Sequence, residues 1–281
     1  MRLLISGLLQ FDSGKTSFSL SLISALKDNG INIFPHKPVA GHNAWYSFYT
    51  MLRSEELNEL VGNDALKYYD EISESQYVND KKEIIREINP FAVLLAVPDI
   101  EKLNFNVRLY RELMSEGIIV TIRVSDCNSS IHFSLSDIQK VIPSPLAEKI
   151  LHLNKVLGAV QVEGEKLKEL LNSSPNLTEK CTQNIFHKYE NVIIESYNDA
   201  LAPNFSSLNA DMLFIVSPGK VLLVDDFKDI AKLFSYPPWL IPVSSFMKYV
   251  RAVRAWDVEP GNYKVNESLL DFILKFIDIN E

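Results

Sequence analysis

The chain begins with a short apolar run, followed by a loop and then by apolar residues at helical spacing. Residues 3–5 are all apolar and lie just before Gly7, which is typical of a buried parallel strand. From Lys15 the apolar positions follow a helical pattern until the Asp-Asn-Gly of residues 28–30 ends it. Residues 31–34 form a second apolar run. The first part of the chain is therefore predicted to form a strand, a loop, a helix and a second strand.

Further apolar runs predict more strands, with amphipathic segments between most of them. Strands are predicted at residues 91–97, 118–124, 156–162, 192–194 and 212–216. Helices are predicted at residues 107–115, 164–171, 227–234 and 267–276. Alternation of this kind predicts an α/β fold with a mostly parallel sheet and helices on both faces.

Two segments modify this simple alternation. Ser-Pro-Gly-Lys at residues 217–220 is a turn signal, so residues 212–224 are expected to form a hairpin at the sheet edge. Residues 126–145 are rich in Ser, Asn and Pro, which indicates an excursion from the sheet. We therefore expect a single α/β domain over residues 1–281, with an insertion or excursion around residues 101–150.

The overall charge argues against one class of partner and allows another. A formal net charge of -8 over 281 residues is unfavourable for a nucleic-acid surface, which requires many Lys and Arg residues. A local nest of backbone amides can still hold a small anion. Hydrophobic residues make up 47% of the chain, which is ample for a buried core.

Cysteine use and hydropathy predict a cytoplasmic protein. Cys127 and Cys181 belong to no C-x-x-C pair, so we expect two reduced, incidental thiols. No run approaches the roughly 18 apolar residues of a membrane span. The first apolar stretch continues into Gln10 and Asp12 with no cleavage site, so it is expected to be a core strand and not a signal peptide.

The loop after the first strand carries the clearest chemical motif. Residues 7–17 are GLLQFDSGKTS, so a strand, a glycine-bearing loop, G-K-T and a helix follow one another. In this arrangement backbone N–H groups and a helix N-terminus surround a polyphosphate, a lysine reaches the β- and γ-phosphates, and a hydroxyl ligates Mg²⁺. The sequence therefore predicts a P-loop for ATP and Mg²⁺, with nucleotide contacts from Asp12, Ser13, Gly14, Lys15, Thr16 and Ser17.

The spacing of this loop departs from the usual motif. G-x-x-x-x-G-K-[ST] is the common form, whereas six residues separate Gly7 from Gly14 here, and Leu9 stands where the first glycine is expected. A wider loop follows from this spacing. A plain structural turn capped by Thr16 is the alternative interpretation.

The second predicted strand ends in P-H-K-P-V, which places Lys37 beside the loop, because ligands bind at the C-terminal ends of parallel strands. G-K-T followed by K-P-V at residues 37–39 resembles dethiobiotin synthetase and its relatives among P-loop amidoligases. The resemblance implies that Lys37 binds substrate and phosphate. It also implies an ATP-dependent ligase reaction and a homodimer.

Further pieces of the chain occur in the order of this family. Asn-Asp-Ala-Leu at residues 63–66 looks like the segment that supplies a metal-ligating aspartate, and Asn-Pro at residues 89–90 looks like the dipeptide before the third strand. Val-Ile-Ile-Glu at residues 192–195 looks like the strand that ends in a metal-ligating glutamate. The resemblance implies that Thr16, Asp64 and Glu195 hold Mg²⁺. A helix N-cap is the alternative role for Asp64, and a solvated strand end is the alternative for Glu195.

The acceptor side matches the family poorly. Gly41, His42 and Asn43 replace the usual small polar contact and are the expected substrate residues, and loop packing is the alternative for His42 and Asn43. An aromatic cluster follows at residues 45–49, which indicates a core edge more than a base-stacking platform. The leading hypothesis is γ-phosphoryl transfer, with Lys15 and Lys37 as catalytic residues, to an unidentified small-molecule acceptor such as a carboxylate or carbamate. Alternatives are a polynucleotide or small-molecule kinase, and a nucleotide-controlled switch or assembly ATPase.

Overall fold

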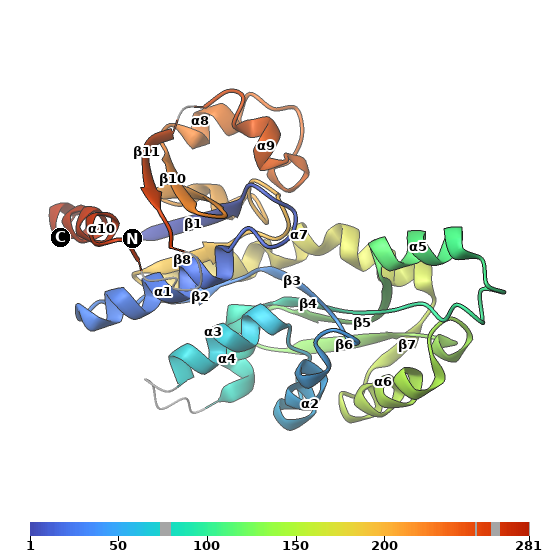
Figure 1. Ribbon diagram of the computed structural model, residues 1–281. Helices are drawn as coiled ribbons and strands as arrows, with labels where there is room; N and C mark the ends of the chain where they lie inside the picture. Colours follow the sequence, from blue (N-terminus) through green and yellow to red (C-terminus); the bar gives the residue numbers. More distant parts are fainter. Residues whose placement is uncertain (74–79, 251, 260–264, 281) are drawn as a thin grey trace. The chain divides into compact units, whose positions relative to one another are not determined.

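The computed structural model describes residues 1–73, 80–250, 252–259 and 265–280. The chain forms two compact units, one made of residues 1–38 and 179–281, the other of residues 39–178. We call them unit 1 and unit 2. Each contains one β-sheet (Figure 1). The fold is mixed α/β, as expected, but the strands belong to two sheets and not to one. Whether the chain behaves as a single domain stays a prediction.

The sheet of unit 1 has six strands in the order β11-β10-β9-β1-β8-β2. Its strands are β1 (Arg2–Gly7), β2 (Phe34–His36), β8 (Val192–Glu195), β9 (Met212–Ser217), β10 (Lys220–Val224) and β11 (Ala252–Asp257). The central strand β1 is parallel to both β8 and β9, and β2 is parallel to β8. Helices α1 (Lys15–Asp28) and α10 (Glu267–Asn280) contact each other, and α1 also packs on β1, β8 and β9.

The second strand begins later than its apolar residues predict. Strand β2 covers residues 34–36 and not 31–34, because its pairing with β8 starts at Phe34 opposite Val192. The Phe34 N–H also donates to the Asn191 carbonyl at 2.8 Å. This shift moves the strand end to His36, so that Lys37 follows it directly.

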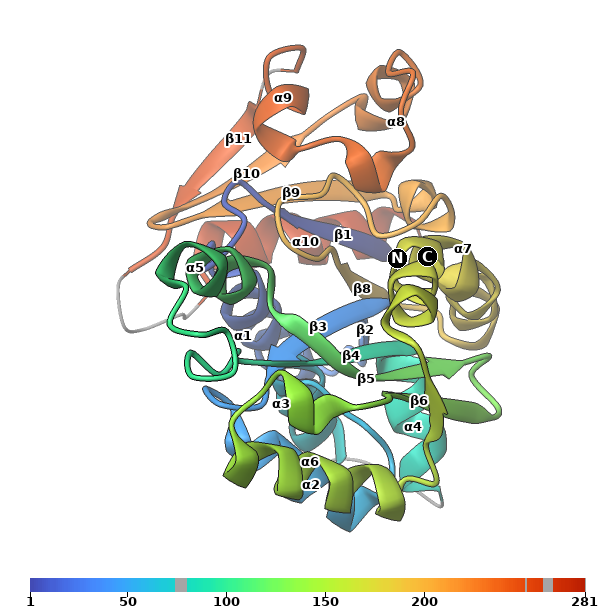
Figure 2. The ribbon, with the colours of Figure 1, turned by 90° about the vertical axis from the view of Figure 1, so that its right-hand side faces the viewer.

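The predicted hairpin is present, although it does not form the sheet edge. Strands β9 and β10 pair antiparallel around a turn in which Gly219 has a φ of 78°. Strand β11 pairs with β10 and forms the edge, as Figure 2 shows. Along the chain, β10 and β11 are separated by the short helices α8 (Phe227–Ala231), η3 (Pro238–Leu240) and α9 (Val243–Phe246). Helix α8 is shorter than the predicted helix at residues 227–234.

The sheet of unit 2 has five strands in the order β3-β4-β5-β6-β7. They are β3 (Val39–Asn43), β4 (Phe91–Ala96), β5 (Ile118–Ser125), β6 (Ser130–Leu135) and β7 (Val160–Val162). Only β3–β4 and β6–β7 are parallel, while β4, β5 and β6 run antiparallel. The expected excursion at residues 126–145 therefore contains a sheet strand, β6. The strand predicted at 156–162 begins only at Val160, because a helix continues to Val156.

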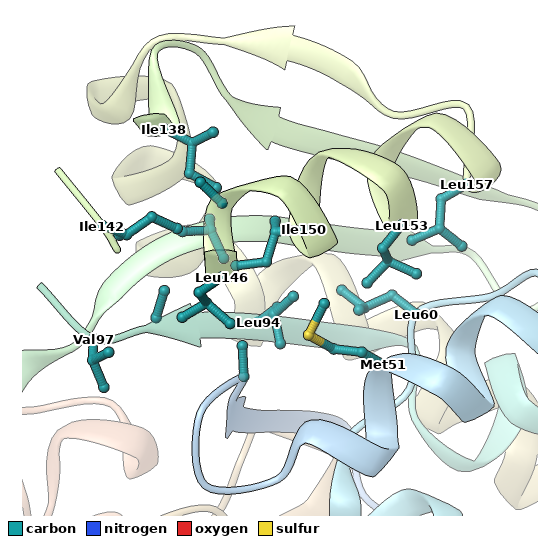
Figure 3. Close-up of a cluster of buried hydrophobic side chains, with 14 of the residues drawn as sticks. Met51, Leu60, Leu94, Val97, Ile138, Ile142, Leu146, Ile150, Leu153 and Leu157 are labelled. Atoms are coloured by element: carbon teal, nitrogen blue, oxygen red, sulfur yellow. The ribbon is translucent and has the colours of Figure 1, made fainter. Parts of the chain in front are cut away.

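Helices α2 (Phe48–Leu57) and α6 (Ser144–Val156) cover one face of this sheet with an apolar cluster (Figure 3). Met51 from α2 and Ile150 from α6 pack around Leu94 of β4. Each fully buried Leu, Ile or Met side chain contributes roughly 1.5–3 kcal/mol. The other helices of unit 2 are α3 (Asn63–Ser73), α4 (Lys81–Ile88), α5 (Val107–Glu116) and η1 (Ile138–Lys140). Residues 164–171 open a much longer helix, α7 (Gly164–Lys188), and η2 covers Ser206–Asn209.

Two expectations about the whole chain can be compared with these elements. In the part of the chain that the structure describes, no helix has the length and hydropathy needed to cross a membrane. Neither Cys127 nor Cys181 is a free thiol. The expectation of two reduced, incidental thiols was therefore wrong, because the spacing of cysteines along a chain does not fix their oxidation state.

Candidate functional site

The loop between β1 and α1 leaves the start of the helix open to an anion. Gly14 is the N-cap residue with a φ of 88°, a left-handed conformation that favours glycine. No side chain caps the helix, and its first turn contains no acidic residue. The first N–H groups of α1 therefore keep the positive end of the helix dipole without an internal carboxylate. Asp12, also left-handed at φ 54°, is exposed on the loop.

Lys15 folds into this loop and not toward solvent. Its side chain is buried, and Nζ donates to the Asn198 carbonyl at 2.6 Å and to Ser13 Oγ at 3.2 Å. A Cβ at position 7 would lie 2.3 Å from Ser13 Oγ and 2.7 Å from Lys15 Nζ. Gly7 therefore gives the lysine the room to lie across the end of β1.

Three neighbouring elements of unit 1 bring Thr16, Lys37 and Glu195 together. Glu195 ends β8, which lies between β1 and β2 in the sheet. Lys37 follows β2, and Thr16 is in the first turn of α1. Since parallel strands end at the same edge, these side chains meet there. One oxygen of Glu195, Oε1, accepts from Lys37 Nζ at 2.6 Å and from Thr16 Oγ1 at 3.0 Å.

Burial makes this contact chemically important. The Lys37 and Glu195 side chains are only 7% and 2% exposed, and a buried carboxylate needs a cationic or hydrogen-bonding partner. Glu195 is therefore not a solvated strand-end acid. Thr16 donates to Glu195 and does not cap its own helix, so the alternative of a turn capped by Thr16 does not hold.

The donor set of Thr16 and Glu195 fits Mg²⁺. A hydroxyl and a carboxylate are hard oxygen ligands, and Mg²⁺ is commonly held by one or two carboxylates together with water and phosphate oxygens. Among the residues that the structure describes, no group of three or more His, Cys, Asp or Glu side chains could hold a metal ion. A metal here would therefore depend on a bound polyphosphate for further ligands.

Ser17 lies in the first turn of α1, and the other predicted residues belong to unit 2. Asp64 lies in the first turn of α3, with Lys67 Nζ 4.0 Å from its Oδ1. Gly41, His42 and Asn43 are on strand β3 and not in a loop. Asn43 Oδ1 accepts from the Trp45 N–H at 2.9 Å, while Gly41 is exposed. The structure therefore brings Thr16, Lys37 and Glu195 into contact, and the roles of these unit 2 residues stay predictions.

His42 has a strongly altered environment. Burial, opposed by Asp64 and assisted by Arg123, lowers the pKa of its imidazole to about 4. The ring is consequently neutral near pH 7. His42 can therefore accept a hydrogen bond or a proton but does not offer a phosphate a positive charge.

Two features of the site region were not predicted from the sequence. The Asn198 carbonyl contacts Lys15 from a left-handed residue with φ 46°. Every residue has a main-chain carbonyl, so the residue type does not reveal that this one accepts a hydrogen bond from the lysine. Asparagine is nevertheless a common residue at left-handed turns. The aromatic cluster was misjudged, because Trp45 and Tyr46 are 60% and 71% exposed and do not form a core edge.

Comparison of the chain with protein-family models, with curated proteins and with solved structures finds no match.

Proposed function

We propose that this protein is a Mg²⁺-dependent, ATP-binding enzyme of the P-loop type that transfers the γ-phosphoryl group of ATP to a small-molecule acceptor. The observation that carries the proposal is the convergence of Thr16 and Lys37 on one buried oxygen of Glu195. This convergence lies beside a loop that already encloses Lys15. The four parallel strands β9, β1, β8 and β2 support the same P-loop interpretation.

Each of these residues has a distinct task in such a reaction. The uncapped N–H groups of α1 bind phosphate oxygens, and Lys15 exchanges its contact with the Asn198 carbonyl for the β- and γ-phosphates. Lys37 donates to the transferred γ-phosphoryl group as its charge spreads over the oxygens. Bound Mg²⁺ neutralises phosphate charge, and the Thr16 hydroxyl and the Glu195 carboxylate would hold it.

The acceptor is proposed from the likeness to dethiobiotin synthetase. An oxygen of a carboxylate or carbamate attacks the γ-phosphorus in line, and ADP leaves. An amine nitrogen of the acceptor then attacks the carbonyl carbon of the mixed anhydride and loses a proton, inorganic phosphate leaves, and an amide forms. Gly41, His42 and Asn43 would contact this acceptor, and Asp64 would add a metal ligand.

Replacement of Lys15 tests the nucleotide site. Lys15→Ala removes the ammonium group that the loop encloses, and we expect at least about a hundredfold loss of ATP turnover, because phosphoryl transfer depends on this kind of charge stabilisation. Phosphate release from ATP with Mg²⁺ provides the measurement. Lys27→Ala, at the exposed end of the same helix, is the matched control and should keep wild-type turnover. Wild-type turnover by Lys15→Ala would exclude this loop as the site.

The fate of the phosphate tests the reaction class. With γ-labelled ATP, a ligase or hydrolase releases the label as free phosphate, whereas a kinase keeps it on the acceptor. We expect free phosphate, with release that increases when carboxylate or carbamate compounds are added. Label retained on an oligonucleotide would instead indicate a polynucleotide kinase, and stimulation by a protein alone would indicate an assembly ATPase.

A further inference from the structure

One oxygen of the Glu195 carboxylate accepts hydrogen bonds from both Lys37 and Thr16. Lys37 Nζ lies 2.6 Å from Glu195 Oε1, and Thr16 Oγ1 lies 3.0 Å from the same atom. The proposed function assigns this carboxylate and this hydroxyl to Mg²⁺. In the metal-free protein, however, an ammonium group already supplies the positive charge there.

We propose that Lys37 occupies the metal-binding oxygen of Glu195 in the metal-free protein and leaves it when a divalent cation enters with the nucleotide. This inference rests on the proposed function and assigns a regulatory step to the same site. The Lys37 ammonium keeps its proton throughout and exchanges one anionic partner, Glu195, for another, the phosphate. The ion pair and the metal site are therefore alternative states of one carboxylate.

Geometry makes the two states exclusive at Oε1 of Glu195. Contact at 2.6 Å leaves no room between Lys37 Nζ and Oε1 for another ion. Thr16 donates its hydroxyl hydrogen to the same oxygen and keeps two lone pairs on Oγ1, so it can ligate a metal without breaking that hydrogen bond. A cation that binds Oε1 must therefore displace Lys37, which has a long, flexible side chain.

Charge explains why the metal enters with the nucleotide. Lys15, Lys37 and Glu195 are the buried charged residues that form the loop site in the described part of unit 1, and they sum to one positive charge. A divalent cation alone would add two more positive charges to a buried site, which is unfavourable at low dielectric. The negative charges of a triphosphate offset this repulsion and give Lys37 a new partner. Binding of metal alone is consequently weak, and binding of metal with nucleotide is strong.

Removal of the Lys37 charge should expose the metal site. In Lys37→Met the Glu195 carboxylate loses its cation, so we expect Mn²⁺ without nucleotide to bind at least about tenfold more tightly than to the wild type. Titration of Mn²⁺, followed by the electron paramagnetic resonance signal of the free ion, measures this affinity. Lys37→Arg keeps the charge and should bind Mn²⁺ as weakly as the wild type. The double variant Lys37→Met, Glu195→Gln should not show this increase in Mn²⁺ affinity, because it lacks the carboxylate.

The outcomes separate this inference from the proposed function. If the wild type binds Mn²⁺ with ATP but Lys37→Met binds Mn²⁺ alone no more tightly, the exchange is wrong and the proposed function stands. If the wild type binds neither ATP nor Mn²⁺ with ATP, both are wrong. Lys37→Gln provides a second neutral variant should Lys37→Met not fold, and circular dichroism of each variant checks folding.

Discussion

Two buried carboxylates, Glu195 and Glu59, use cations in different ways. Glu195, at a strand end beside the loop, contacts the ammonium group of Lys37. Glu59, in unit 2, is bound by Arg86, with Nε at 3.1 Å, and faces Arg123 Nη1 at 3.6 Å. Burial opposes a charge on Glu59, but Arg123 and Arg86 lower its pKa overall. Lysine binds as a movable point charge, whereas the planar guanidinium groups fix Glu59 in place.

The Glu59 cluster is expected to be structural. Arg123 is fully buried, and burial lowers its pKa to about 10, so that it remains charged near pH 7. Glu59→Gln removes its anionic partner, and loss of one member of a buried ion pair costs about 3–5 kcal/mol. We expect a loss of this size in the free energy of unfolding, measured by denaturant titration. Asp70→Asn, which breaks the exposed pair with Arg53, is the control and should change stability little. An equally small loss for Glu59→Gln would contradict this role.

Gly7 is expected to be essential for the loop conformation. Gly7→Ala places a Cβ within 3.0 Å of both Ser13 Oγ and Lys15 Nζ, so the lysine has to leave its position. We expect nucleotide affinity to fall by at least about tenfold, while the overall fold is retained. Equilibrium binding of a fluorescent ATP analogue provides the measurement. Gly164→Ala, whose Cβ would lie 3.6 Å from a Leu135 methyl carbon, is the matched control. Unchanged affinity of Gly7→Ala would show that the Lys15 position does not matter.

Residue type and order predicted residues of the candidate site at Glu195 but not the buried Glu59 cluster of unit 2. G-K-T after a strand identified Lys15 and Thr16, and a glutamate after three β-branched residues identified Glu195. The structure brings Thr16 and Lys37 to that glutamate. The Arg123 contact to Glu59 was not predicted, because the two residues lie far apart in the sequence and share no motif.

At the scale of elements, the sequence predicted the strands that have strong apolar runs but did not predict the strands that contain polar residues. Strand β4 is almost uniformly apolar and matches its prediction closely. Strand β6, with the sequence SIHFSL, alternates polar and apolar residues, and strand β11, with AVRAWD, carries Arg and Asp among apolar residues; both strands are partly exposed. Such segments become strands through pairing with a neighbour, which propensity does not reveal. The start of β2 was misplaced for the same reason, since β8 determines where pairing begins.

One of these missed strands, β6, carries a pH-sensitive contact. His132 Nε2 accepts the Leu60 N–H at 3.2 Å, so this nitrogen carries no proton. Burial and the charge on Arg123, opposed by Glu59, lower the pKa of His132 to about 4. The unfolded imidazole titrates near 6.5. The unfolded state therefore binds more protons between these two values, and stability is lost as the pH falls through this window.

This contact predicts a measurable slope of stability against pH. From pH 7 to pH 4, His132 should contribute a loss of up to about 3 kcal/mol in the free energy of unfolding. His132→Gln cannot be protonated, so its stability should fall less steeply over the same range. Ile131→Ala, at an exposed position on the same strand, should keep the wild-type slope. Denaturant titrations at several pH values test this, and parallel curves for His132→Gln and the wild type would refute it.

At the scale of the whole chain, each unit has its own sheet and its own buried residues. Ile150 belongs to the apolar cluster between α2, α6 and β4 in unit 2. Leu213 lies on β9, in the middle of the sheet of unit 1. Alternation of strands and helices predicted the α/β class, but the order of elements along a chain does not show which strands become neighbours. The division into two sheets could therefore not be predicted from the alternation of strands and helices.

Because each unit has its own buried core, we expect the two units to open independently of each other. Ile150→Ala and Leu213→Ala each remove a fully buried side chain, at a cost of about 2–5 kcal/mol. If the units open independently, Ile150→Ala should accelerate amide hydrogen exchange in β3, β4 and β5 and leave β1, β8 and β9 protected. Leu213→Ala should produce the reverse pattern. Uniform acceleration throughout the chain in both variants would mean that the units unfold as one cooperative body. In that case a ligand bound at the Lys15 loop would stabilise β4 as much as β1, because only global opening would remain.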